Sequence, residues 1–158
     1  MDSDLITRAA ALIAVLGTGV VYGTDVFCAI VLRPALTAVD DRALVVVMGR
    51  VHRYGDRRMP APGVIGLLGS AVSAVLATAT GNWAQAIAAG VALVALSIWL
   101  VVYTRVSAPI NKQMTAAAEA GQDVADGRAL QGKWDRVIDA RALLQGVAVA
   151  ALCVVLMT

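Results

Sequence analysis

The sequence predicts an all-α membrane protein: a bundle of four transmembrane helices in one domain, with an interfacial amphipathic helix in the first loop. Of the 158 residues, 59% are hydrophobic and only 15% are charged, whereas a soluble domain has about 25% charged residues. Four apolar runs reach the roughly 20 residues that a helix needs to cross a hydrocarbon core about 30 Å thick. The basic residues gather in two of the segments between these runs.

The four expected spans cover most of the chain and leave room for one domain only. Backbone groups in lipid must pair within the chain, so runs of this length are expected to be helices. Pro60 and Pro62 open the second span, where proline is tolerated in the first turn. Only Gly81 and Asn82 separate the second span from the third, which predicts an antiparallel hairpin. The predicted spans are residues 9–32, 61–80, 83–104 and 137–157.

The arginines and lysines lie on one side of the predicted membrane, and the opposite side has only Arg8. Cytoplasmic loops of membrane proteins carry an excess of these residues. Both basic segments are therefore predicted to be cytoplasmic and both termini extracytoplasmic, in a protein of the cytoplasmic membrane such as a bacterial inner membrane. The basic residues are Arg33, Arg42, Arg50, Arg53, Arg57 and Arg58 in the first segment, and Arg105, Lys112, Arg128, Lys133, Arg136 and Arg141 in the second.

The first basic loop is predicted to contain a helix over residues 42–54, which Asp40 or Asp41 would cap. Its apolar face comprises Leu44, Val47, Met48 and Val51. A helix with one apolar face and several arginines elsewhere is typical of a segment lying in the interface of an anionic leaflet.

Asp25 is the most informative single residue because it is an acid inside the first span. Ionisable residues in membrane spans are costly and usually face the interior of the bundle, where they pair with other groups or take part in function. Thr18, Tyr22 and Asp25 recur at helical spacing, which predicts a polar stripe. Arg141, about one turn inside the fourth span, is the expected partner of Asp25. Alternatively, Arg141 and the neighbouring Trp134 are an interfacial anchor bound to lipid headgroups.

His52 is the only histidine, so the chain cannot supply a multi-histidine metal site, and no metal or other cofactor is predicted. On the amphipathic helix His52 would be either solvated or a general base, since its unperturbed pKa lies near neutral pH. Cys28 and Cys153 are expected at depths that differ by roughly 15 Å. Because a disulfide needs Cα atoms within about 7 Å, two free thiols are expected.

Charge and motif patterns narrow the function classes. The formal net charge is only +2, and the basic residues are not interleaved with aromatic ones, which argues against nucleic acid as a partner. The sequence contains no GxSxG nucleophile motif and no phosphate-binding glycine loop. The partners that fit are the lipid bilayer, a hydrophobic small molecule, and another membrane protein or a second copy of the chain.

Three short motifs follow one another along the chain. Gly23 lies in a first span that ends at Arg33-Pro34, and Met59-Pro60 leads into the second span. The third motif is residues 106–111 (VSAPIN), followed after a variable stretch by Trp134 and, seven residues later, Arg141. In order and spacing these motifs resemble the anthrone oxygenase family of membrane proteins, also called DUF1772, over nearly the whole chain. At Ile138 the chain departs from the family, whose members often carry histidine or asparagine there.

The resemblance implies oxidation of a flat, phenolic, polyketide-like molecule, an anthrone becoming an anthraquinone without an established metal or flavin. A base would remove an acidic C–H proton, and the resulting carbanion would react with oxygen directly. The catalytic residues under this hypothesis are Asp25 or His52 as the base and Arg141 as an oxyanion donor. The substrate-binding residues are Asn111 as a second donor, Trp134 as a stacking ring, and Tyr22.

Two other function classes fit the sequence. A non-enzymatic interaction subunit would use small-residue faces, such as Gly66 and Ser70, to pack closely on a larger membrane partner or on a second copy. A component of a small-molecule exporter would use Asp25 as a proton-coupled acid.

Overall fold

The computed structural model describes residues 3–121 and 126–158. It confirms the all-helical fold, since these residues contain helices and short turns but no strand. Four helical segments are long and apolar enough to cross a membrane, which makes the chain an integral membrane protein. The segments are Ser3–Thr37, Pro60–Ala79, Trp83–Ala120 and Gly127–Met157.

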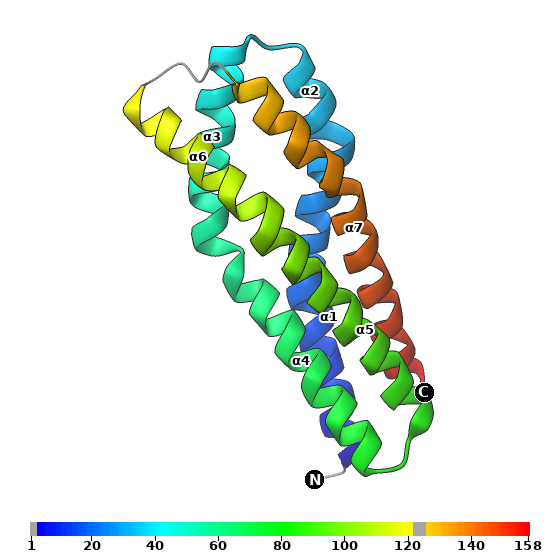
Figure 1. Cartoon of the computed structure of the whole chain (residues 1–158). Coiled ribbons are helices and arrows are strands. Elements are labelled where there is room, and N and C mark those ends of the chain that lie inside the picture. The colour runs from blue at the N-terminus through cyan, green and yellow to red at the C-terminus, as the bar shows by residue number, and fades with distance from the viewer. Residues whose placement is uncertain (1–2, 122–125) are drawn as a thin grey trace.

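The helices α1 (Ser3–Phe27), α4 (Pro60–Ala79), α5 (Trp83–Val102) and α7 (Gly127–Met157) form the four-helix bundle. In it, α1 packs against α4 and α7, and α5 packs against the same two helices from the other side. Both termini lie at the end that holds the α4–α5 turn, here called the terminal end (Figure 1). The opposite, basic end is formed by α2 (Arg33–Thr37), α3 (Asp41–Arg58), α6 (Ala108–Ala120) and the start of α7 (Figure 1).

Three of the four helical segments are longer than the sequence predicted. The first continues past Pro34 to Thr37, the third runs on from residue 104 to Ala120, and the fourth begins at Gly127 and not at residue 137. These segments have 35, 38 and 31 residues, well above the roughly 20 needed to cross the hydrocarbon core. Hydropathy marks only the lipid-facing part of each helix, so it missed the parts that belong to the basic end.

Two π-helical turns explain why Pro34 and Pro109 do not end their helices. Proline has no N–H and its ring clashes with the carbonyl four residues earlier. In η1 (Cys28–Leu32) and η2 (Tyr103–Ser107) the chain adopts a wider turn just before each proline. The N–H of Arg33 donates to the Cys28 carbonyl and that of Ala108 to the Tyr103 carbonyl, five residues back in each case.

The helix predicted in the first loop is confirmed as α3, and the Asp40 side chain caps it by accepting a hydrogen bond from the Ala43 N–H (2.8 Å). Its surroundings differ from the prediction. It packs lengthwise against α6 and buries Leu44 and Met48, whereas Val47, on the same predicted face, is exposed. The buried side chains of α3 thus contact α6, where the sequence had predicted contact with a membrane leaflet.

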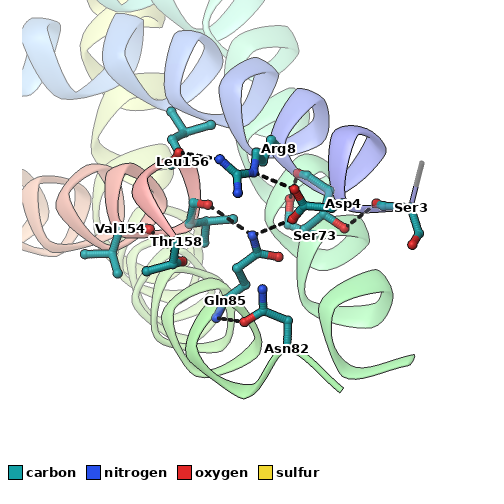
Figure 2. A network of polar contacts seen from close by, with 11 residues as sticks. Ser3, Asp4, Arg8, Ser73, Asn82, Gln85, Val154, Leu156 and Thr158 are labelled. Carbon is teal, nitrogen blue, oxygen red and sulfur yellow. Dashed lines mark hydrogen bonds and ion pairs between the residues drawn. The ribbon is translucent and has the colours of Figure 1, made fainter. Parts of the chain in front are cut away.

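Two clusters of buried side chains hold the bundle together. The cluster at the terminal end consists mainly of alanines from α1, α5 and α7, including Ala14, Ala92 and Ala148. There, buried Gln85 donates through Nε2 to an Asp4 carboxylate oxygen (2.9 Å), whose other oxygen accepts from Arg8 (2.8 Å), as Figure 2 shows. The cluster at the basic end contains larger side chains, among them Leu36, Leu44, Met48, Met114, Trp134 and Ile138.

The packing of α3 on α6 leads to a stability prediction at two glycines of α3. A Cβ atom at Gly49 would collide with the carbonyl oxygen of Met114, whereas one at Gly55 would meet nothing within 4 Å. We expect Gly49→Ala to lower the free energy of unfolding by about 1–3 kcal/mol. Gly55→Ala should leave it unchanged or raise it by up to about 1 kcal/mol, since alanine favours helix. Unfolding in detergent micelles measures both, and a fully stable Gly49→Ala protein would contradict this packing.

Candidate functional site

A cavity of about 180 Å³ lies where the four-helix bundle meets α3 and α6. Most of its lining is apolar, but five of the six site residues predicted from the sequence also line it. They come from four different helices: Asp25 from α1, His52 from α3, Asn111 from α6, and Trp134 and Arg141 from α7. The structure therefore brings together side chains that are far apart in the sequence.

Tyr22 is the predicted site residue that does not line the cavity. Its ring lies against α7, where a Cβ atom at Gly146 would be 3.3 Å from the Tyr22 ring. Three residues along an α-helix amount to a rotation of about 300°, so Tyr22 and Asp25 point about 60° apart. Asp25 lies at the edge of the cavity and also bonds to Arg141 and Gln145 of α7, whereas Tyr22 is turned away from the side of α1 that lines the cavity.

Asp25 and Arg141 form the buried ion pair that the sequence predicted. Arg141 Nη2 donates to Asp25 Oδ1 at 2.8 Å, and the two residues are only 5% and 2% exposed. The second carboxylate oxygen of Asp25 accepts hydrogen bonds from Gln145 Nε2 and from Trp99 Nε1. Both oxygens of Asp25 are thus already hydrogen-bonded within the protein, which leaves Asp25 poorly suited to accept a proton from a ligand.

Arg141 is held on several sides. Its Nη1 donates to the hydroxyl of Ser107 in η2 (2.8 Å). Its guanidinium carbon lies 5.6 Å from the ring centre of Tyr103 and 5.5 Å from that of Trp134, within the range of cation–π attraction. The guanidinium is therefore fixed between α1, η2 and two aromatic rings, and it is not a headgroup anchor at the surface.

A second polar group in the cavity is built around Asp56, a residue that the sequence analysis missed. One carboxylate oxygen of Asp56 accepts hydrogen bonds from the Tyr103 hydroxyl (2.9 Å) and from Asn111 Nδ2 (2.8 Å). The signal for Tyr103 was its spacing of four residues from Trp99, against whose ring it stacks. Gln145 likewise follows Arg141 by one turn. Asp56 carried no signal, because its role depends on where α3 packs.

His52 is buried, which corrects the expectation that it could be solvated. It is 5% exposed and its ring lies against Trp134, with ring centres 5.6 Å apart. Burial lowers the pKa of His52 to about 4, with Arg141 contributing in the same direction and Asp56 opposing it. His52 is therefore a neutral imidazole at pH 7.

Four buried polar atoms of the cavity residues have no hydrogen-bond partner within the chain: His52 Nε2, Asn111 Oδ1, Trp134 Nε1 and Arg141 Nε. Buried polar atoms in proteins are almost always hydrogen-bonded to protein, water or a ligand. The indole and guanidinium nitrogens are donors, the amide oxygen is an acceptor, and the imidazole nitrogen can be either. Across the described part of the chain, no group of three or more His, Cys, Asp or Glu side chains is arranged to hold a metal ion.

Comparisons with known proteins give no family assignment. No family model matches the chain, and neither the curated proteins nor the solved structures contain a match. Any functional conclusion therefore depends on the geometry and chemistry of the cavity.

The buried ion pair leads to a prediction about stability. Asp25→Leu would leave Arg141 buried without a counter-charge, so we expect a loss of about 3–5 kcal/mol. The double variant Asp25→Leu/Arg141→Met should recover most of that loss, because it removes both charges. Asp139→Ala is the matched control, since it breaks the exposed pair between Arg33 and Asp139 and should cost at most about 1 kcal/mol. If unfolding in detergent showed equal losses for Asp25→Leu and Asp139→Ala, the pair would not be buried.

The lowered pKa of His52 predicts a loss of stability in acid. The unfolded chain, with a histidine pKa near 6.5, binds a proton between pH 6.5 and about 4 while the folded protein does not. Stability should therefore fall as the pH drops below about 6.5, by up to about 3 kcal/mol from this residue near pH 4. Melting temperatures of the wild type and His52→Gln at pH 7.5 and 5.0 measure this contribution. An equally large acid shift in His52→Gln would assign the effect to other groups.

Proposed function

We propose that this membrane protein is anthrone-oxygenase-like and binds a flat, largely apolar aromatic molecule carrying a ketone or phenol oxygen in the cavity. The observation that carries the proposal is the set of four buried polar atoms without a partner, from His52, Asn111, Trp134 and Arg141, which are residues that line a mostly apolar cavity. Ligand sites for small molecules commonly combine apolar walls with a few polar groups that fix orientation. A ligand oxygen would accept from the indole and guanidinium N–H groups, and a ligand hydroxyl would donate to Asn111.

The size of the cavity agrees with a ring-shaped ligand. An apolar cavity of about 150 Å³ in another protein holds a benzene molecule, and the present one is about 180 Å³. A molecule of two or three fused rings would fit if it also used the open part of the cavity beside Thr24 and Val51, which are both exposed lining residues.

The oxidation that the family resemblance implies is part of the proposal, with His52 and not Asp25 as the base. The neutral His52 imidazole has an unpartnered Nε2, whereas both oxygens of Asp25 are engaged. The lowered pKa of His52 makes it a weak base in the empty cavity, so it would take the proton of the acidic C–H only as the ring oxygen gains negative charge, which Arg141 and Trp134 stabilise and which favours the imidazolium beside it. Addition of O₂ to the carbanion and return of the proton give a hydroperoxide. Loss of water from the hydroperoxide gives the quinone, so the electrons lost by the ring reduce O₂.

The two alternative function classes have less support. An interaction subunit has no need of four buried polar atoms without partners beside an internal cavity. A proton-coupled exporter would need Asp25 to exchange protons, but three side chains donate to its carboxylate. The alanine cluster of the terminal end also fills the bundle between the cavity and that end.

The orientation in the membrane belongs to the same proposal, with the basic end in the cytoplasm. The positive-inside rule supports it, because the arginines of α3 and the basic residues of α6 and early α7 lie at the basic end (Figure 1). The cavity would then lie toward the cytoplasmic leaflet.

The proposed function predicts the behaviour of three purified variants toward anthrone. All measurements use a Trp83→Phe background, which removes an exposed tryptophan outside the cavity and leaves Trp99 and Trp134. Binding of anthrone should quench the fluorescence of these two residues, and anthraquinone should form in the presence of O₂. Asn111→Leu should weaken binding about tenfold, the loss of one buried hydrogen bond. His52→Gln should bind but form no anthraquinone above the uncatalysed rate.

The control for these measurements is Tyr22→Phe, which alters a tyrosine outside the cavity lining and should leave binding and turnover unchanged. Mass spectrometry of the protein purified in mild detergent provides the second test, since a co-purifying aromatic molecule identifies the natural ligand. Absence of quenching by anthrone, together with a co-purifying membrane protein in place of a small molecule, would favour the interaction subunit.

A further inference from the structure

The walls of the cavity are not equally closed. On the side of α4 and α5, Val64 and Leu100 line the cavity and are exposed, but the Trp99 ring spans the gap between the two helices and lies against Gly63, where a Cβ atom would be 3.4 Å from the ring. On the side where α3 meets η2, the hydrogen bond from the Tyr103 hydroxyl to Asp56 joins the two elements. Ring packing and a hydrogen bond therefore close these two sides.

The side between α1 and α3 is open. Thr24 of α1 and Val51 of α3 both line the cavity and are both exposed on the surface. The helix α1 packs closely on α4 at Gly17. Farther toward the basic end, α3 packs mainly against α6 and not against α1. Within the described residues, no hydrogen bond or ion pair joins residues 21–28 to residues 48–56.

The α1 rim of this opening is apolar, whereas the α3 rim also carries arginines: Arg50 is exposed next to Val51, and the Arg58 guanidinium lies over the Tyr54 ring at 5.1 Å. The hydroxyl of Thr24 donates to the Val20 carbonyl, which leaves its methyl group as the outward contact. Exposed apolar side chains flank the opening on both helices: Val20, Phe27 and Ile30 on α1, and Val47 and Tyr54 on α3. On the α1 side, the next basic residue is Arg33 at the start of α2, nine residues beyond Thr24 and about 14 Å along the continuous helical segment. The α1 side of the opening is thus suited to acyl chains, and the arginines of α3 can reach lipid headgroups at its edge.

We propose that a lateral portal between α1 and α3, bounded by Thr24 and Val51, admits the ligand to the cavity directly from the lipid bilayer. The proposal rests on the proposed function insofar as the cavity is the ligand site. It also narrows the ligand class, because the portal selects molecules that dissolve in the hydrocarbon region over molecules delivered from water. A ligand oxygen would meet Arg141 and Trp134 only after the apolar part had passed the rim.

Cys28 offers a reporter of access, since it lines the cavity and is buried. With Cys153 replaced by serine, the full chain in liposomes would be labelled with N-ethylmaleimide, which is uncharged, or with a permanently charged thiosulfonate. We expect N-ethylmaleimide to label Cys28 and the charged reagent to label it roughly tenfold more slowly or not at all. Equal labelling by the two reagents would show access from water and overturn the portal.

Matched tryptophan variants test the position of the portal. Val51 and Val47 lie one turn apart on α3 and are similarly exposed, at 43% and 45%, but only Val51 lines the cavity. We expect Val51→Trp to slow labelling of Cys28 by N-ethylmaleimide roughly tenfold and Val47→Trp to leave it unchanged. The same comparison on α1 pairs Thr24→Trp with Val20→Trp, whose parent residue is exposed and does not line the cavity.

The outcomes separate this inference from the proposed function. Labelling of Cys28 requires no ligand, so a protein that fails to bind anthrone can still show the portal. Wild-type labelling rates in both Val51→Trp and Thr24→Trp would overturn the portal even if anthrone binds. All four substitutions are at exposed positions, where the fold tolerates a larger side chain.

Discussion

The ion pair between Asp25 and Arg141 is the constraint around which the basic half of the bundle is arranged. Removing two charges from water costs several kcal/mol per ion, and only close pairing with further hydrogen bonds offsets it. Here the further hydrogen bonds come from Gln145, Trp99 and Ser107. The pair thereby ties α1 to α7 and draws η2 toward both, so the helices that border the cavity cannot shift independently.

The two π-helical turns place residues where a regular helix would not. Such turns often occur at functional sites, and here η1 begins at Cys28, a cavity residue, while η2 begins at Tyr103 and ends at Ser107. The widened turn before Pro109 contains both Ser107, whose hydroxyl accepts from Arg141, and Tyr103, whose hydroxyl donates to Asp56. A proline that usually interrupts a helix therefore contributes to the shape of the site.

Much of the site was predictable from the sequence because charges are scarce in membrane spans. Asp25 and Arg141 lie in otherwise apolar runs at compatible depths, so few other pairings were available. The positions of His52 and Asp56 were not predictable in the same way. Both residues reach the cavity because α3 packs against α6, whereas the sequence predicted that α3 would lie on a membrane leaflet. Hydropathy located the spans but not their ends, because the extensions at the basic end carry polar and charged residues that lower their mean hydropathy. That Tyr22 does not line the cavity was not predictable either, because a polar stripe at helical spacing does not distinguish residues that point about 60° apart.

The contrast between the two buried clusters has a mechanical consequence. Alanines such as Ala14, Ala92 and Ala148 let the helix axes approach closely at the terminal end, whereas leucine, methionine and tryptophan side chains separate them at the basic end. Hydrogen bonds of Asp4 with Arg8 and Gln85 further tie the helices together at the terminal end (Figure 2). Because the Asp25–Arg141 pair keeps α1 and α7 together, we expect any widening that admits a ligand to occur beside α3 and to leave the terminal end unchanged. A ligand at the basic end would therefore leave the close small-residue packing of the terminal end intact.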